Sequence, residues 1–381
     1  MNSSVRTSIS LLALVVVAGS VLAGTWLVEK DGTGHFTVIQ EALDASSPGD
    51  TILIGPGRFT ETNTVVLPGW TNEIYAAVWN DSIMIIGSGV DVTIIGPDEP
   101  LKQPINDRPK GIFGGYNTVG GRISHLTVEN VRDGVVWESG LEIEQCNIRG
   151  CVDALIALPT TGLLVADMLF ENNSEDAINA WGPCPDMRVV NCEFIDNGVG
   201  ISVVSLGYLL VEGCEFSDYT VGVQYDHTIG EVRDCRFNDG RSADVVSIGS
   251  HLTLSDCRLS SAYTAISAST WGFLWGSGNI IPAGEGPRLR ICNTLFYFNG
   301  NHIFRTDGSY IELDCYISQP HDILDFTGNY WGTTSADSIS AAIWDGHDDP
   351  EIHAYVDFTP FSPTPVAGER KSWSDLKSMF R

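Results

Sequence analysis

Two short segments place an acidic side chain next to a histidine, and both residue types can do chemistry. Asp226 is followed by His227, and His321 is followed by Asp322. Carboxylates are common Ca²⁺ ligands, and carboxylate and imidazole groups both act in proton transfer. These four residues are therefore our catalytic candidates. Short matches of this kind also arise by chance, so a structural context is required before any of them is assigned a role.

Large aromatic side chains near one of these pairs suggest a second kind of chemistry. Tyr225 directly precedes Asp226, and Trp181, Trp271 and Trp275 lie in segments rich in turn-forming residues. Aromatic rings beside polar turns can stack on sugars, because the C–H faces of a sugar ring are apolar and an aromatic face is amphipathic. We predict that these four aromatic residues bind carbohydrate. The alternative is that they pack beneath an insertion as a satellite hydrophobic cluster.

A repeat of about 22 residues organises the middle of the chain. In each unit a marker residue and the residue two positions later are apolar while their neighbours are polar, which is the alternation of a β-strand. A small residue such as Gly200 or Gly222 opens a second strand, and turn formers separate the two. Such a repeat predicts a solenoid. The markers are Leu126, Cys146, Met168, Cys192, Cys214, Cys235, Cys257, Cys292 and Cys315, with an insertion expected between Cys257 and Cys292.

In a solenoid, each coil buries its inward side chains only against the coils above and below. Equivalent residues then form columns with a spacing of about 4.8 Å, the distance between neighbouring strands. Cysteine is small and often buried, and parallel side chains at this spacing lie slightly beyond disulfide range. We therefore expect an inward column, rather than disulfides or a metal site, at Cys146, Met168, Cys192, Cys214, Cys235 and Cys257.

The phase of the repeat also places the candidate residues. Trp181, Asp226, His227 and Trp271 follow their markers by 12 to 14 residues. We expect them on the turn after the second strand, along one edge of the solenoid and spaced by about two coils, or about 10 Å. The expected insertion, which contains Trp275, begins at the same turn. Insertions on one face of a repeat protein often mark its binding face.

The two ends of the chain differ from the repeats. Residues 1–23 have the pattern of a secretory signal peptide, because Arg6 precedes an apolar stretch that is too short to span a bilayer and small residues follow it. We expect one solenoid domain at residues 24–358, and a proline-rich linker with a short tail at residues 359–381. This organisation predicts secretion to the extracellular space, the cell surface or the periplasm.

Motifs at both ends of the solenoid resemble those of the pectin-lyase-like superfamily. An amphipathic segment at residues 36–45 precedes Gly-Asp-Thr at 49–51 and Pro-Gly at 56–57, as in the capping helix and first strand of these proteins. Gly-Asn-Tyr-Trp-Gly at 328–332 is similar to the motif that closes many bacterial β-helix domains. The resemblance covers most of residues 25–360. It implies an all-β, right-handed parallel β-helix with a short N-terminal capping helix.

The resemblance does not assign an activity, because this superfamily includes lyases, hydrolases, esterases, epimerases and non-catalytic proteins. Residues 223–227 partly resemble the Trp-Ile-Asp-His segment of pectate lyases, which implies Ca²⁺ as the cofactor to test. Residues 320–322 are similar to part of the Asp-Pro-His-Asp motif of mannuronan epimerases, with Gln319 in place of the first aspartate. The sequence contains no ordered set of the pectinesterase or polygalacturonase catalytic residues.

The charge of the chain excludes some classes of binding partner. Acidic residues outnumber basic ones by 48 to 21, for a net charge of −27. This field repels nucleic acid, and it repels anionic polysaccharide unless Ca²⁺ or a local positive region intervenes. After the leader, no stretch is apolar enough to span a membrane.

Two hypotheses follow. The first is a non-catalytic protein that binds glycan or a cell-surface partner, which the lack of a complete catalytic set favours. The second is a polysaccharide lyase, hydrolase or epimerase with a diverged active site.

Overall fold

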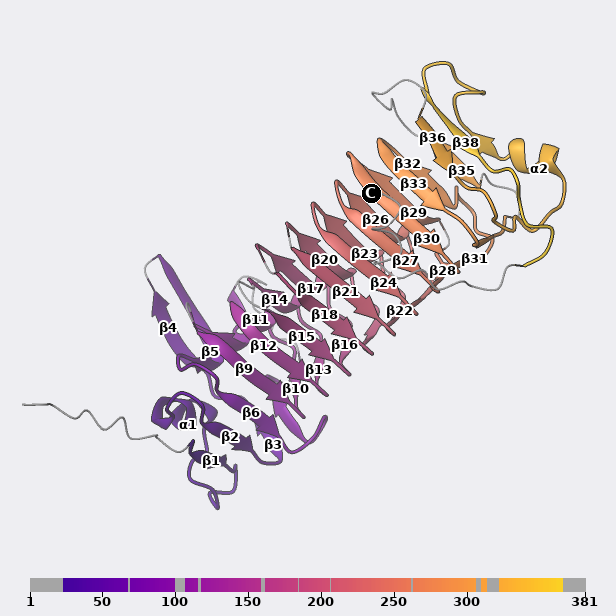
Figure 1. Ribbon diagram of the computed structural model, residues 1–381. Helices are drawn as coiled ribbons and strands as arrows, with labels where there is room; N and C mark the ends of the chain where they lie inside the picture. Colours follow the sequence, from indigo (N-terminus) through magenta and orange to yellow (C-terminus); the bar gives the residue numbers. More distant parts are fainter. Residues whose placement is uncertain are drawn as a thin grey trace, which may run out of the picture.

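The computed structural model describes residues 23–67, 69–99, 107–115, 118–158, 162–183, 185–205, 207–261, 263–305, 310–313 and 322–365. Within them the chain winds into an elongated right-handed parallel β-helix (Figure 1). The predicted fold class is therefore confirmed. Almost all of the predicted leader, the tail after residue 365, His321 and Cys315 lie outside the described residues.

Each regular coil contributes one strand to each of three sheets, and strands from successive coils pair in parallel. Sheet A contains β1 (Thr25–Val28), β2 (Thr51–Ile54), β6 (Met84–Gly87), β9 (Val119–Ser124), β12 (Ser139–Glu144), β15 (Leu163–Ala166), β18 (Met187–Val190), β21 (Tyr208–Glu212), β24 (Ile229–Arg233), β27 (His251–Ser255), β30 (Gly272–Ser277), β33 (Thr294–Phe298), β36 (Asp322–Asp325) and β38 (Ala354–Asp357). Sheet B contains β3 (Gly57–Phe59), β7 (Thr93–Ile95), β10 (Thr127–Glu129), β13 (Asn147–Arg149), β16 (Leu169–Glu171), β19 (Glu193–Ile195), β22 (Glu215–Ser217), β25 (Arg236–Asn238), β28 (Arg258–Ser260), β31 (Ile280–Ile281) and β34 (His302–Ile303). Sheet C contains β4 (Asn63–Leu67), β5 (Trp70–Val78), β8 (Lys110–Gly114), β11 (Asp133–Trp137), β14 (Asp153–Ala157), β17 (Asp176–Trp181), β20 (Val199–Val204), β23 (Val221–Asp226), β26 (Ala243–Ile248), β29 (Thr264–Ser269), β32 (Leu289–Ile291), β35 (Ile311–Leu313) and β37 (Ile343–Trp344).

The predicted cysteine column is present at the corner between sheets A and B. Its cysteine thiols are buried and are not disulfide-bonded, and Met168 lies between Cys146 and Cys192. Burial raises the pKa of the Cys146 thiol to about 12, so this sulfur stays protonated and unreactive. The buried members of the column are Cys146, Met168, Cys192, Cys214, Cys235 and Cys257.

A second inward column in sheet B consists of phenylalanine rings. Phe170, Phe194, Phe216 and Phe237 stack with centroid distances of 4.5 to 5.0 Å and interplanar angles of 10° or less. The strand spacing sets this separation, and each aromatic pair adds about 0.5–1.5 kcal/mol beyond the burial of its apolar area. The column extends the hydrophobic core along the axis of the solenoid.

The tight corners explain why the chain is rich in aspartate, asparagine and glycine. The residue before the inward marker adopts a left-handed backbone conformation, as at Asp167 (φ 52°), Asn191 (φ 53°) and Gly213 (φ 65°). Only glycine, asparagine and aspartate adopt this conformation readily. One such residue turns the chain from sheet A into sheet B without a loop.

The expected insertion between Cys257 and Cys292 is absent, which corrects the assigned phase. The coil after Cys257 is regular, and its marker is Asn279, whose Oδ1 accepts a hydrogen bond from the Cys257 N–H at 3.0 Å. Asn301 and Asn329 continue the column. Cys292 instead follows β32 at the corner between sheets C and A, and it is disulfide-bonded. Trp275 therefore belongs to a regular strand, β30.

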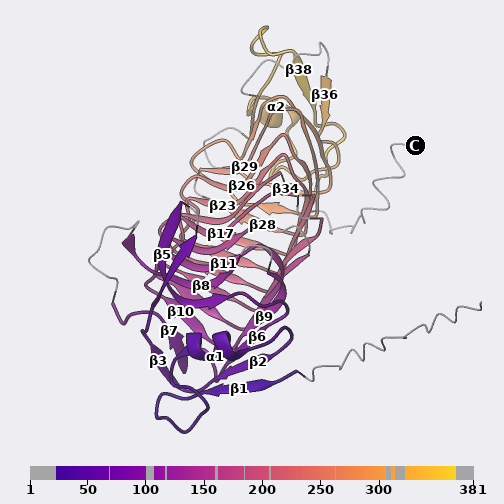
Figure 2. The same ribbon diagram turned by 90° about the vertical axis from the view of Figure 1, so that its left-hand side faces the viewer.

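Both open ends of the solenoid are covered. Helix α1 (Ile39–Ala45) lies across the N-terminal end beside β1 and β2 and buries Ile39, Ala42 and Leu43 (Figure 2). Near the other end, Trp331 is fully buried, and helix α2 (Ala336–Ser340) follows it. These caps protect apolar core and strand edges that would otherwise be exposed. In the described part of the chain, no helix has the length and apolar character needed to cross a membrane.

Charged side chains share a column at the start of sheet C. The ammonium of Lys110 donates to the Asp133 carboxylate, Asp133 pairs in register with Asp153, and Asp153 Oδ1 accepts from the Asp176 N–H at 3.3 Å. Burial, followed by the negative charges of Asp153 and Glu175, raises the pKa of Asp176 to about 7. The acidic end of this column is thus destabilised when it is fully ionised.

We expect Cys214→Asp to destabilise the fold by several kcal/mol, because it places an unpaired carboxylate in the dry cysteine column. Glu215→Gln, on the exposed side of the next strand, should change the free energy of unfolding by no more than about 0.5 kcal/mol. Denaturant unfolding of both variants measures the difference. Equal losses would contradict the assigned inward and outward positions.

Asp176→Asn should stabilise the protein at neutral and alkaline pH. The pKa of Asp176 is about 7 in the folded state and about 3.9 in an unfolded chain. The folded state therefore holds an extra proton between these values, and stability falls as the pH rises through that window. After allowance for solvent screening, the gain should be roughly 1–2 kcal/mol at pH 8 and close to zero near pH 4. Thermal unfolding across this pH range, with the exposed Asp218→Asn as control, tests the effect.

Candidate functional site

Aromatic rings cover part of the outer face of sheet A near its C-terminal end. In β30, Phe273 and Trp275 point outward, whereas Leu274 between them is fully buried. The Trp275 ring lies parallel to Phe273 (centroids 5.7 Å apart, 11°) and to Tyr297 of the next coil (6.3 Å, 11°). His251 meets Phe273 edge to face at 4.8 Å. We call these four residues, His251, Phe273, Trp275 and Tyr297, the aromatic platform.

A second group lies beside the platform, at the corner where sheet C passes into sheet A. The register Ile229↔His251↔Phe273 places His227, Gly249 and Trp271 in one column, two residues before those positions. All three have left-handed backbone conformations. Trp271 is 60% exposed and directly precedes β30, so its indole adjoins the platform. We call these three residues the corner column.

Gly249 gives the corner column its shape. It lies between His227 and Trp271, and a Cβ at this position would lie only 3.0 Å from His227 Nε2. The imidazole therefore lies over Gly249, which has no side chain. The neighbouring Asp226 carboxylate contacts Nδ1 of the same ring and orients it, and the side chain as a whole is exposed.

The predicted edge of the solenoid exists, but its members are not all where we expected them. Trp181 is exposed at the end of β17, and Trp181, Val204 and Asp226 occupy successive positions in register. Trp275 lies on the face of sheet A instead of at the turn. Tyr225 is fully buried, and its hydroxyl donates to the Glu231 carbonyl at 3.4 Å. A buried ring cannot face a ligand, so Tyr225 is removed from the binding surface.

Asp226 and Asp322, one residue from each acid–histidine pair, lie far apart along the solenoid. Asp322 begins β36, four strands along sheet A from β24, which follows His227. At about 4.8 Å per strand this is a separation of roughly 19 Å. Among the residues that the structure describes, Asp226 is the hydrogen-bonding partner of the His227 ring, and no group of three or more histidine, cysteine, aspartate or glutamate side chains could hold a metal ion.

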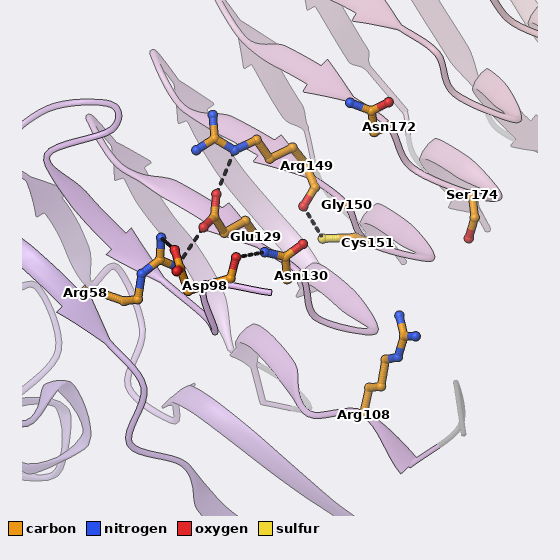
Figure 3. Close-up of a pocket in the computed structure, with 10 residues that line it drawn as sticks. All are labelled: Arg58, Asp98, Arg108, Glu129, Asn130, Arg149, Gly150, Cys151, Asn172 and Ser174. Carbon is orange, nitrogen blue, oxygen red and sulfur yellow. Dashed lines mark hydrogen bonds and ion pairs between the residues drawn. The ribbon is translucent and has the colours of Figure 1, made fainter. Parts of the chain in front are cut away.

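The sequence did not indicate a further cavity, which lies on the outer face of sheet B near the N-terminal end (Figure 3). It has a volume of about 620 Å³. We call it the arginine pocket because three guanidinium groups line it. Its lining residues are Arg58, Asp98, Arg108, Glu129, Asn130, Arg149, Gly150, Cys151, Asn172 and Ser174.

One nearly buried carboxylate organises the first wall of the arginine pocket. Glu129 Oε1 accepts from Arg58 Nη1, and Glu129 Oε2 accepts from Arg149 Nε, both at 2.7 Å. The same guanidinium groups reach more exposed carboxylates, Asp98 at 3.1 Å and Asp91 at 3.0 Å. Arg58 belongs to β3, Glu129 to β10 and Arg149 to β13. The network therefore links coils that are far apart in sequence.

Comparisons with known proteins agree with this fold. Residues 133–281 match the family model described as right handed beta helix region. No curated protein sequence matches the chain. Among solved structures, the chain is similar to the A-module of the mannuronan C-5 epimerase AlgE6 of Azotobacter vinelandii, with 12% identity and a TM-score of 0.50 over 87% of this chain and 95% of that one.

Two further solved structures are similar at the same level. One is the Agl-KA catalytic domain, with 11% identity and a TM-score of 0.50 over 84% of this chain and 64% of that one. The other is the catalytic domain of a GH87 α-1,3-glucanase, with 11% identity and a TM-score of 0.49 over 84% and 66%. At such identities the likeness concerns the fold alone. The chain has the fold of a right-handed parallel β-helix.

Proposed function

We propose that this protein is secreted and binds carbohydrate on the surface formed by the aromatic platform and the corner column. The observation that carries the proposal is the parallel, outward orientation of Phe273, Trp275 and Tyr297, with the exposed Trp271 beside them. The platform rings stack on one another and remain partly exposed on the solvent side of the sheet, and Trp271 adds a 60% exposed indole. Sugar rings offer apolar C–H faces of matching size, and their hydroxyl groups remain in water.

The sheet makes this surface rigid before any ligand arrives. Trp275 lies opposite Thr253 and Tyr297 in continuous parallel pairing, so its backbone cannot shift without breaking the ladder. Rings held in place lose little conformational freedom on binding, which improves affinity for a given contact area. A regular strand spacing also suits a ligand with a regular repeat.

The charge of the protein favours a neutral glycan. The net charge of −27 repels bare polyanions. Polar groups beside the aromatic rings, including His227 Nε2 and the Asp226 carboxylate, can instead hydrogen-bond sugar hydroxyls. Secretion rests on the leader-like pattern of residues 1–23 and would place the surface where extracellular glycans occur.

A polysaccharide-active enzyme is the second candidate. It is favoured by the Asp226–His227 pair, which lies on the same edge of the solenoid as Trp181 and Trp271. An oriented, exposed imidazole can accept or donate a proton at Nε2. This pair alone is not a complete catalytic set, so we propose binding first and test turnover beside it.

Trp271→Ala and Trp275→Ala should each weaken glycan binding by about tenfold, or ~1.4 kcal/mol, because each removes one stacking ring. Binding of the mature protein to an array of neutral and anionic polysaccharides measures the loss. Trp344→Ala, at an exposed tryptophan on sheet C, is the matched control and should bind normally. If the wild-type protein bound no glycan, or if all three variants lost binding equally, the assignment of this surface would fail.

Turnover separates the two candidates. If the protein only binds, incubation with a bound polysaccharide should release no new reducing ends and no unsaturated products, with or without added Ca²⁺. Product formation that His227→Ala abolishes, while the folded state and glycan binding persist, would instead establish the enzyme. The exposed position of His227 makes this variant unlikely to affect folding.

A further inference from the structure

We propose that the arginine pocket binds an oxyanion, a carboxylate, sulfate or phosphate group carried on a small molecule, and that Arg108 and Arg149 are its cationic ligands. The pocket lies on sheet B in the N-terminal coils, whereas the aromatic platform lies on sheet A in the C-terminal coils. The inference is therefore independent of the proposed carbohydrate surface.

Positively charged side chains gather in the arginine pocket, although the protein as a whole is acidic. The chain has 48 acidic and 21 basic residues, yet three arginines converge here. The lining has two negative charges, Asp98 and Glu129, and Asp91 outside it pairs with Arg149 at 3.0 Å, so the charges balance when no ligand is bound. An anion that displaces the exposed Asp91 would meet a net charge of +1 and would be attracted by its field.

Arg108 is unpaired among the residues that the structure describes. Within the described residues its guanidinium makes no hydrogen bond or ion pair, and its Nε is buried without an acceptor. Figure 3 shows the side chain extending alone toward Cys151 and Ser174, in contrast to the dashed contacts of Arg58 and Arg149. A buried N–H without an acceptor is costly. The Nη groups of the same guanidinium, which lines the pocket, are the donors offered to a ligand oxygen.

Arg149 is held in position for the same ligand. Glu129 accepts from its Nε at 2.7 Å, which orients the guanidinium plane. Its Nη2 contacts Asp91, whose side chain is 57% exposed. An exposed ion pair contributes little to stability, so an incoming oxyanion can exchange with Asp91 at small cost. Guanidinium groups bind carboxylate, sulfate and phosphate through paired N–H donors.

The rest of the pocket is polar and open. Asn172 and Ser174 provide an amide and a hydroxyl on the wall opposite Glu129 (Figure 3). Gly150 keeps the floor clear, since a Cβ there would lie 2.6 Å from Asn130 Oδ1 and the backbone φ is +64°. The volume of about 620 Å³ exceeds that of a lone oxyanion and falls in the range of small-molecule sites. The anion is therefore expected to belong to a larger polar molecule.

Calorimetric titration of the folded protein with sodium sulfate, sodium phosphate and sodium glucuronate, at constant ionic strength, tests the proposal. We expect saturable binding with one site per chain for at least one probe. Sulfate or phosphate binding would identify a tetrahedral anion, and glucuronate binding would identify a carboxylate. Arg108→Gln should weaken the binding at least tenfold. Arg241→Gln, at an exposed arginine paired with Asp196 outside the pocket, should leave it unchanged.

Two readouts distinguish a lost site from a lost fold. Because the Arg108 guanidinium makes no hydrogen bond or ion pair with the described residues, Arg108→Gln should retain the wild-type melting temperature without ligand. It should also retain wild-type binding on the polysaccharide array, so the failure of either proposal would leave the other standing. The absence of saturable binding for all three probes would overturn the inference, as would equal affinity of Arg108→Gln and the wild type.

Discussion

The structure depends on one constraint, the in-register pairing of parallel strands. Every residue lies about one strand spacing from its equivalents in the coils above and below. A residue type is therefore tolerated only if it packs well against its neighbours in the same column. Cysteine at the A–B corner and phenylalanine in sheet B meet this requirement by dry packing and ring stacking. The aspartates in the column at the start of sheet C repel one another when ionised. Burial and this repulsion raise the pKa of Asp176.

The same constraint shapes the outer faces, where function resides. In-register neighbours bring side chains of one kind together without any loop to hold them. The aromatic platform arises in this way from β27, β30 and β33, and the corner column from successive turns. The arginine pocket is different, because Glu129 and Arg149 are in register in sheet B while Arg58 reaches Glu129 from a different column.

Much of the fold was predictable from the sequence, because the repeat leaves a periodic signal. The cysteine column, the capping helix and the edge with Trp181, Asp226 and Trp271 were found in this way. The phase was wrong after Cys257 because asparagine replaces cysteine as the marker. The recurring Gly-Asn pairs at 278–279, 300–301 and 328–329 were the signal that was missed. Alternation from the buried Val223 would likewise have placed Tyr225 inside.

The arginine pocket could not be found from the sequence. Glu129 and Arg149 each lie three residues after a marker, but Arg58 belongs to a first coil without a marker, so the repeat does not connect it to them. The change of marker from cysteine to asparagine has a further consequence. The cysteine thiols make weak hydrogen bonds to backbone carbonyls of the preceding coil. Asn279, Asn301 and Asn329 are joined by side-chain amides that also bond backbone carbonyls. Amide hydrogen bonds therefore tie successive coils together more strongly near the C-terminal end, where Trp275 and Tyr297 of the aromatic platform lie.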